Sequence, residues 1–335
     1  MCALGCASKI ENTTDRATKS DGGDAASGGS AAGHGGADAS ETDKLGFDNA
    51  DPGAIPIAGT AADSGAAADS AGNEPIEKTP EVCDGIDNDG NGIIDDIDVQ
   101  HDGVCDCLRI ATIGQIGPWS DGGNVFKKWL NERSSTPAVA LGDMVLTDDL
   151  LRTFQVIVVL HAAPIDVMAN GSTTPGHHVF SDAEAAAFVH WVQAGGGAMT
   201  TIGYTLMQAQ EVVNVNQLLS PFDMAYSTSK FDLNGDIGTW IPHPITQDIK
   251  KVYIEHGVEP SGNAGMTLAY DDSNHVALQV LQVKEGRLVV WGDEWITYDS
   301  QWQSVRDQQV ERLWLNILKW LSPPKACQVP LPALF

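Results

Sequence analysis

The stretch Gln155-Val-Ile-Val-Val-Leu160 carries apolar side chains at five consecutive positions. A strand that is apolar on both faces must be covered on both faces, as is typical of a central strand in a parallel sheet. Helix signals flank it: Thr147 is a candidate N-cap before the stretch, and Ser181 with Glu184 forms a capping-box pattern after it. The sequence therefore predicts a parallel sheet with helices on both faces.

Alternating strand and helix patterns extend this prediction along the chain after Cys107. We expect strands at 108–114, 138–141, 198–202 and 224–226, and helices at 124–133, 147–152, 181–194 and 210–219. Beyond Pro242 the pattern changes to strands joined by turns, at 251–256, 266–270, 276–283 and 287–291, before a final amphipathic helix at 305–321. Repeated β-α units with one antiparallel edge predict an α/β fold, a three-layer flavodoxin-like sandwich with a mostly parallel sheet.

The beginning of the chain has a different composition. Residues 8–80 are mostly Ala, Gly, Ser, Asp, Thr and Asn, with Phe47 as the only aromatic residue. Such a segment buries too little apolar surface to offset its ordering entropy, so we expect a disordered linker. The expected organisation is a truncated lipoprotein signal at 1–7, the linker at 8–80, an acidic cysteine-containing segment at 81–107, the α/β domain at 108–322 and a tail at 323–335.

The formal net charge of the 335-residue chain is −26 at pH 7. Its few Lys and Arg residues are scattered, whereas binding a phosphate backbone requires them in clusters, so we expect no nucleic-acid partner. No apolar run approaches the roughly 20 residues that a membrane-spanning helix needs. Membrane attachment is therefore expected only through a lipid anchor.

A lipid anchor is suggested by the start of the chain. Leu4-Gly5-Cys6-Ala7-Ser8 resembles a bacterial lipobox, in which the cysteine is lipidated. Ala3 stands where leucine is usual, and an upstream start codon would supply the missing charged and apolar leader. The alternative is a cysteine pair, Cys2 and Cys6, without function on a cytosolic chain. Lipidation of Cys6 predicts an exported protein, tethered at the cell envelope or outer surface of a bacterium.

The acidic segment has the spacing of a calcium-binding loop. From Asp87 to Asp98 it reads D-N-D-G-N-G-I-I-D-D-I-D, with Gly92 at the sixth position, where such a loop turns sharply. The expected ligands are five side chains and one backbone carbonyl: Asp87, Asp89, Asn91, Ile93 (the carbonyl), Asp95 and Asp98. Asp84 and Asp96 are expected to be outer-shell or solvated. The rival interpretation is an ordinary exposed turn, but the regular spacing favours Ca²⁺.

Four further cysteines remain: Cys83, Cys105, Cys107 and Cys327. In an exported protein they can form two disulfides. Because Cys105 and Cys107 are too near each other in sequence to pair comfortably, we expect Cys83 to pair with one of them and Cys327 with the other. A zinc site is the alternative, although the C-x-C spacing is not that of a common zinc module.

Several stretches resemble class I glutamine amidotransferase-like domains of the uncharacterised and ThuA-like branches. They are 156–164, 180–191, 195–197, Thr201-Ile-Gly-Tyr204, His243-Pro-Ile-Thr246 and 286–293, within a region of about 108–321. Separately, Glu81-Val-Cys-Asp-Gly-Ile-Asp-Asn-Asp-Gly-Asn-Gly92 resembles a short metal-binding motif of myxobacterial surface proteins.

In active amidotransferases a nucleophilic cysteine lies on the turn after a central strand, and a histidine and a glutamate follow a late strand. The matching turn here is Gly203-Tyr204-Thr205, and the late loop, Gly292-Asp293-Glu294-Trp295, lacks histidine. A phenol with a pKa of about 10 cannot replace a thiolate. We therefore expect no glutaminase activity.

In a doubly wound sheet, ligands bind beyond the carboxyl ends of the strands. The residues expected there are Gln115, Trp119, His161, Tyr204, Asp293, Glu294 and Trp295. They are suited to a polar ligand such as a glycan, because aromatic faces stack on sugars and carboxylates bind hydroxyls. The alternative is structural, with the tryptophans at the edge of the core and Asp293 capping a loop. We interpret His177-His178 as part of a surface loop.

The leading hypothesis is a non-catalytic lipoprotein with a calcium-binding acidic loop, whose degenerate amidotransferase-like domain binds a polysaccharide or an envelope protein. The alternative is a glycan-directed hydrolase that uses Asp293 or Glu294 as acid or base. A third possibility is a purely structural component of an envelope assembly, which would lack a pocket with converging polar groups.

Overall fold

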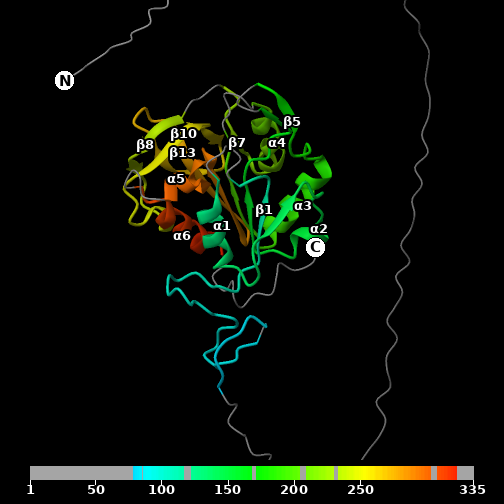
Figure 1. Cartoon of the computed structure of the whole chain (residues 1–335), viewed down its shortest axis with the longest axis vertical. Helices are drawn as coiled ribbons and strands as arrows, with labels where there is room; N and C mark the ends of the chain where they lie inside the picture. The colour runs from blue at the N-terminus through cyan, green and yellow to red at the C-terminus, as the bar shows by residue number, and fades with distance from the viewer. Residues whose placement is uncertain are drawn as a thin grey trace, which may run out of the picture. The chain divides into compact units, whose positions relative to one another are not determined.

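The computed structural model describes residues 78–84, 86–116, 122–167, 171–203, 209–229, 233–302 and 308–322. These residues all belong to one unit of the chain, Gly72–Phe335 (Figure 1). Five features named above lie outside the described residues: the lipobox with Cys6, nearly all of the linker, Trp119, Tyr204 and the tail with Cys327.

An eight-stranded sheet forms the centre of this unit, in the order β2-β1-β3-β6-β14-β13-β12-β9. Its strands are β1 (Ile110–Ile113), β2 (Val139–Gly142), β3 (Val156–Val159), β6 (Gly197–Thr200), β9 (Thr239–Trp240), β12 (Met266–Tyr270), β13 (Val276–Val283) and β14 (Gly286–Trp291). The first five strands in the sheet order pair in parallel, and the remaining pairs are antiparallel. The parallel part has the 2-1-3-4-5 order of a flavodoxin-like sheet, which confirms the predicted fold class.

Helices cover both faces of the sheet. They are α1 (Asn124–Asn131), α2 (Asp148–Leu151), α3 (Asp182–Gln193), α4 (Ala209–Leu219), α5 (Asp299–Trp302) and α6 (Val310–Leu321). Alternate residues of a strand point to opposite faces, so Val156 and Val158 join the core under α1 and α6, whereas Ile157 and Val159 join the core under α2, α3 and α4. Figure 1 shows α1 and α6 on one side of β1 and α2 and α3 on the other.

The predicted helix starts are confirmed where the sequence supplies a cap. Ser181 accepts a hydrogen bond from the backbone of Glu184, and the Glu184 side chain accepts one from the backbone of Ser181. Thr147 likewise accepts from the backbone of Leu150 at the start of α2. A Cβ on Gly196 would lie 2.3 Å from the Trp191 ring, so only glycine lets the chain turn from α3 into β6 beneath that ring.

The remaining strands form three two-stranded ribbons outside the central sheet. They are β10 (Val252–Gly257) with β8 (Leu233–Ile237), β11 (Pro260–Gly262) with β7 (Met224–Tyr226), and β4 (Ile165–Val167) with β5 (Thr173–Pro175). Three 3₁₀ turns complete the described elements: η1 (Ser220–Phe222), η2 (Pro244–Thr246) and η3 (Glu294–Thr297). The four strands expected beyond Pro242 are confirmed as β10, β12, β13 and β14, whereas β11 and the separation of β10 from the central sheet were not predicted.

The final helix is shorter than predicted. It starts after Gln309, which takes the N-cap position, and a separate short helix, α5, precedes it. Among the described residues, no helix combines the length and the apolar character needed to cross a membrane.

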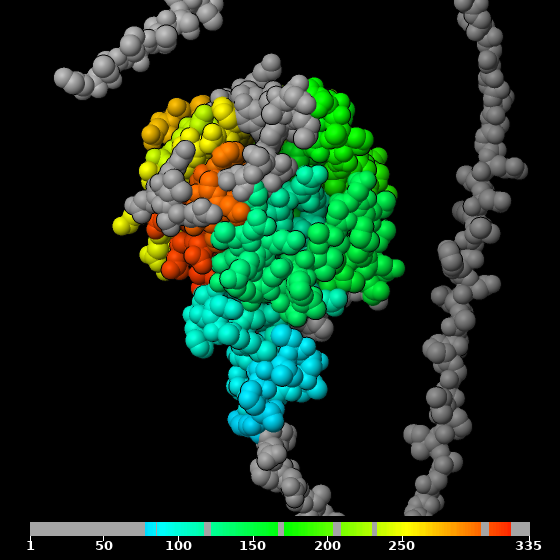
Figure 2. All heavy atoms as spheres, in the orientation of Figure 1, coloured from blue at the N-terminus to red at the C-terminus, as the bar shows by residue number. Residues whose placement is uncertain are grey.

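The acidic segment projects from the domain (Figure 2) but is anchored to it at its base. The Arg133 side chain donates from Nε and Nη2 to one oxygen of Asp102, at 2.9 and 2.6 Å. The guanidinium also lies 4.1 Å from the centre of the Trp129 ring. Val104 is 2% exposed and belongs to the core under α1 and α6. The segment therefore ends as a packed part of the domain.

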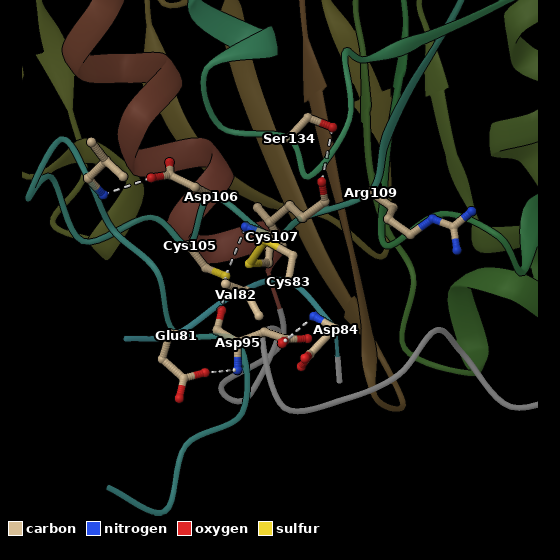
Figure 3. The surroundings of a disulfide bond; sticks show 12 residues. Glu81, Val82, Cys83, Asp84, Asp95, Cys105, Asp106, Cys107, Arg109 and Ser134 are labelled. Carbon is tan, nitrogen blue, oxygen red and sulfur yellow. Dashed lines mark hydrogen bonds between the residues drawn. A yellow bond between two sulfur atoms is a disulfide. The ribbon is translucent and has the colours of Figure 1, made fainter. Parts of the chain in front are cut away.

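A disulfide joins Cys83 to Cys107, across a sequence separation of 24 residues (Figure 3). This is one of the two pairings left open for Cys83. Cys105 is also disulfide-bonded, and its partner is not among the described residues. The pairing of Cys105 with Cys327 stays a prediction.

Candidate functional site

Side chains of the acidic loop fold back onto its own backbone. Asp87 accepts hydrogen bonds from the backbone N–H groups of Asn91 (3.1 Å) and Gly92 (2.9 Å), and Asp89 accepts from Asn91 (2.9 Å). The Asn91 side chain in turn accepts from the backbone of Ile93 at 2.7 Å. Gly92 has a φ of +91°, a conformation that L side chains rarely adopt. These contacts coil the loop around Gly92, and its binding of Ca²⁺ stays a prediction.

A glutamate that the sequence pattern did not reveal holds this loop closed. Glu81 accepts a hydrogen bond from the backbone of Asp89 at 2.7 Å. It accepts another from the backbone of Asp95 at 3.0 Å (Figure 3). Oxygen atoms of Glu81, Asp89 and Asp96 lie within 4.8 Å of one another. The Asn91 amide donates to both Asp89 and Asp96. The acidic cluster therefore includes Asp96, which was expected to lie outside the first shell of ligands.

Two of the predicted calcium ligands make other contacts. Asp95 has a φ of 56° and accepts a hydrogen bond from the backbone of Asp84 at 3.0 Å. Asp98 accepts from the backbones of Asp102 and Gly103, at 2.9 and 2.7 Å, and so stabilises the next turn of the chain. Asp98 therefore stabilises the segment that joins the loop to the domain, a role that the spacing within the loop does not predict.

The carboxyl edge of the parallel sheet brings together His161, which follows β3, and Glu294, which follows β14. The Nδ1 atom of His161 lies 3.4 Å from Glu211 and 3.5 Å from Glu294, and its Nε2 atom lies 2.8 Å from Asp166. His161, Glu211 and Glu294 are 3%, 0% and 2% exposed. The Gln115 backbone donates to the carbonyl of His161 at 3.1 Å, so this predicted residue also lies at the edge. Glu211, in the first turn of α4, was missed.

Burial and charge shift the pKa values of this group. Burial alone lowers the pKa of His161, but the charges of Glu211 and Glu294 and the hydrogen bond to Asp166 raise it to about 10. Burial raises the pKa of Glu294 to about 8, against the opposing effect of His161. Burial also raises the pKa of Asp293 to about 7, against hydrogen bonds from the backbone.

Asp293 has a structural role. It accepts hydrogen bonds from the backbone of Trp295 at 3.0 Å and of Glu255 at 2.8 Å, and so caps η3 and holds β10 beside it. This confirms the interpretation of Asp293 as a loop cap. The Trp295 ring stacks on Tyr298, with ring centres 4.7 Å apart. Neither Asp293 nor Glu294, each 2% exposed, presents an accessible carboxylate at the edge.

A cavity of about 130 Å³ lies at the same edge, beside β1 and β3. Its polar lining comes from the ends of several strands: Gln115 after β1, Asp143 after β2, His161 after β3, Asp166 in β4 and His177 after β5. Sequence reasoning placed only Gln115 and His161 here, because the meeting of Asp143, Asp166 and His177 depends on how the loops fold over the sheet.

The prediction of a surface loop at His177-His178 is wrong for His177, which is 7% exposed. Its Nδ1 atom lies 2.9 Å from the carbonyl of His178, and its Nε2 atom has no hydrogen-bond partner among the described residues. The His178 ring stacks on it and lies between Asp143 (2.6 Å) and Glu184 (2.7 Å). His177 therefore lines the cavity, and the His178 ring packs against it.

The order and pairing of the strands define the chain as an α/β protein with a doubly wound, flavodoxin-like sheet. Solved structures of similar fold include the mmIFT52 N-terminal domain, with a TM-score of 0.49, 15% identity and coverage of 63% of this chain and 96% of that chain. A cytoplasmic protein from Salmonella typhimurium LT2 (TM-score 0.45, 12% identity, 64% and 99% covered) is also similar.

A ThuA-like protein from Bacteroides uniformis (TM-score 0.40, 12% identity, 64% and 91% covered) is another structural neighbour. At these identities the likeness concerns the fold alone, and the fold class stated here rests on the sheet order itself. Neither a protein-family model nor a curated protein matches the chain.

Proposed function

We propose that this chain is a non-catalytic, lipid-anchored protein of the bacterial cell envelope. Its α/β domain binds a polar ligand such as a glycan at the carboxyl edge of the sheet, and its acidic loop binds Ca²⁺. The observation that carries the binding role is the cavity at which Gln115, Asp143, Asp166 and His177 converge. A purely structural component of an assembly would have no need of such a convergence.

The chemistry of the cavity suits hydroxyl groups. Asp143 and Asp166 offer acceptor oxygens, and the buried Nε2 atom of His177 can donate or accept. A volume of about 130 Å³ is small beside the roughly 300–1,000 Å³ typical of sites for drug-sized ligands. The cavity therefore suits one polar unit, such as one sugar of a longer chain, rather than a large cofactor.

Binding is favoured over hydrolysis by the burial of the two carboxylates that the hydrolase alternative requires. Asp293 and Glu294 are 2% exposed, and Asp293 is committed to two backbone hydrogen bonds. The turn at which amidotransferases of the resembled family carry their nucleophile reads Gly203-Tyr204-Thr205 and supplies no thiol.

Calcium binding is supported by the coiled acidic loop and by the oxygens of Glu81, Asp89 and Asp96. The resemblance of 81–92 to a myxobacterial metal-binding motif supports the same role. Export is supported by the disulfide between Cys83 and Cys107, because such bonds persist in oxidising compartments. The proposed lipidation rests on the lipobox-like sequence at Cys6.

The binding role is tested on an array of neutral oligosaccharides, probed with the full chain and with two cavity variants, His177→Gln and Asp143→Asn. Asp272→Asn is the matched control, because Asp272 is exposed and outside the cavity. We expect the wild type and Asp272→Asn to bind a common set of glycans, and both cavity variants to bind them at least about 10-fold more weakly, as loss of a buried polar contact implies. Absence of binding by the wild type, or equal binding by all four proteins, would refute the proposal.

A further inference from the structure

Three buried side chains at the carboxyl edge hold donor atoms close to one another, and one of these atoms, Oε2 of Glu211, accepts a hydrogen bond from the backbone of Gly203 at 3.0 Å. The Nδ1 atom of His161 and the Oε2 atom of Glu294 are both buried and have no hydrogen-bond partner within the part of the chain that the structure describes. The Nδ1 atom lies 3.4 Å from Oε2 of Glu211 and 3.5 Å from Oε2 of Glu294. All three donor atoms lie within 4.8 Å of one another.

These separations are longer than good hydrogen bonds and fit metal coordination. An N–H···O hydrogen bond spans about 2.7–3.2 Å between heavy atoms. In a tetrahedral site with bonds of about 2.1 Å, two ligand atoms are about 3.4 Å apart. The distances from His161 to Glu211 and to Glu294, at 3.4 and 3.5 Å, match the edges of such a tetrahedron.

The outer atom of each side chain is held in place by a second contact. Asp166 lies 2.8 Å from Nε2 of His161, the arrangement in which a carboxylate orients a metal-binding imidazole. Glu211 accepts a hydrogen bond from the backbone of Ala162 at 3.0 Å through its Oε1 atom. Glu294 accepts one from the Tyr298 hydroxyl at 2.9 Å through its own Oε1 atom. The three donor atoms are therefore preorganised.

The backbone leaves space for this arrangement only because residue 203 is glycine. A Cβ at Gly203 would lie 2.5 Å from Nδ1 of His161 and 2.8 Å from Oε2 of Glu211. Both His161 and Asp166 also line the cavity of about 130 Å³, so the group lies beside that cavity.

We propose that His161, Glu211 and Glu294 form a binding site for a divalent transition-metal ion of the Zn²⁺ class. Two carboxylates and a neutral imidazole match its charge, and the imidazole ligand favours Zn²⁺ over Ca²⁺ or Mg²⁺, which take oxygen ligands. The three side chains leave a fourth tetrahedral position for water or a ligand. This site is separate from the acidic loop, and it does not depend on the proposed glycan binding.

The competing arrangement is a protonated His161 paired with the two carboxylates and no metal. To decide between them, the full chain is stripped with a chelator and returned to excess Ca²⁺, so that the acidic loop is saturated. It is then titrated with Zn²⁺ by calorimetry and with Co²⁺ by visible absorption. We expect one equivalent of Zn²⁺ to bind despite the Ca²⁺, and Co²⁺ to give the intense bands of a tetrahedral site, which Zn²⁺ then removes.

Variants assign the binding to these residues. Glu294→Gln and His161→Gln should each lower Zn²⁺ affinity at least about 100-fold, and Asp166→Asn should lower it by about 10- to 100-fold, because it loosens the imidazole. Asp272→Asn should leave the affinity unchanged, because Asp272 is exposed and lies outside the cavity and the three-residue group. Failure of the wild type to bind Zn²⁺ or Co²⁺ overturns the proposal. If a ligand variant does not fold, Asp166→Asn still decides the matter, because Zn²⁺ affinity equal to that of the wild type in this variant also overturns the proposal.

Discussion

Arg133→Met tests how firmly the acidic segment is docked on the α/β domain. The substitution keeps an apolar stem beside Trp129 but removes the two hydrogen bonds to Asp102, at 2.9 and 2.6 Å. It also removes the hydrogen bond from Nη1 to the carbonyl of Trp129 at 2.9 Å. The two charged side chains are 6% and 15% exposed, so water screens their attraction only weakly.

Removing one partner of a buried ion pair costs about 3–5 kcal/mol, because the other charge is left uncompensated. Asp102 retains a hydrogen bond from the backbone of Val104 at 2.9 Å and some exposure, which places the cost near the lower end of that range. The contact of the guanidinium with the Trp129 ring adds about 0.5–1 kcal/mol. We therefore expect Arg133→Met to lower the free energy of unfolding by about 3–4 kcal/mol.

The assay is urea unfolding of the oxidised full chain at fixed Ca²⁺, followed by tryptophan fluorescence. Arg109→Met is the matched control, because Arg109 is exposed, and it should change the free energy of unfolding by no more than about 0.5 kcal/mol. A double-mutant cycle with Asp102→Asn isolates the coupling between the two side chains. If Arg133→Met costs less than about 1 kcal/mol, or no more than the control, the reasoning about the docked segment is wrong.

Three further predictions concern pH, packing and calcium. In metal-free protein, folding raises the pKa of Glu294 to about 8, so the folded state keeps a proton that the unfolded state loses above a pH of about 4.5. The free energy of unfolding should therefore fall as pH rises from about 4.5 to 8, by up to about 1.4 kcal/mol per pH unit. In thermal melts over this pH range, stability should fall less steeply for Glu294→Gln than for the wild type, and an equal slope would contradict this prediction. Gly203→Ala should lower the free energy of unfolding in urea by about 1–3 kcal/mol, because the added methyl group overlaps neighbouring atoms. Gly238→Ala is the control and should lower it by less than about 1 kcal/mol, because the space around Gly238 is open; equal losses would contradict the packing argument. In calcium calorimetry, Asp89→Ala should weaken Ca²⁺ binding at least about 10-fold. Asp98→Ala should weaken it much less, because the Asp98 side chain stabilises the next turn of the chain. A larger loss of affinity in Asp98→Ala than in Asp89→Ala would instead support Asp98 as a ligand, as its spacing predicts.

Local patterns in the sequence predicted most of the fold. The apolar run through Val156 and Val159 identified a strand that is buried on both faces, because alternate residues enter different cores. The capping box at Ser181 and Glu184 fixed the start of α3, because the reciprocal contacts span only three residues. Placing β10 outside the central sheet depends on long-range packing against β8, which no local pattern encodes.

The candidate sites were predicted less completely, because their residues are distant in sequence. Glu211 has no distinguishing context in the first turn of α4, and its role follows from the folding of that turn against His161. Glu81 precedes the acidic loop and acts on its backbone, so spacing within the loop gives no sign of it. Asp143 and His177 meet only when the connections after β2 and β5 close over the sheet.

The most direct test of the binding role is the mass of a glycan recovered after long incubation with the full chain, with Glu294→Gln incubated in parallel. A binding module with buried Asp293 and Glu294 returns the captured glycan at unchanged mass from both proteins. Shorter products from the wild type that are missing with Glu294→Gln, while binding persists, would contradict this account and establish the hydrolase instead.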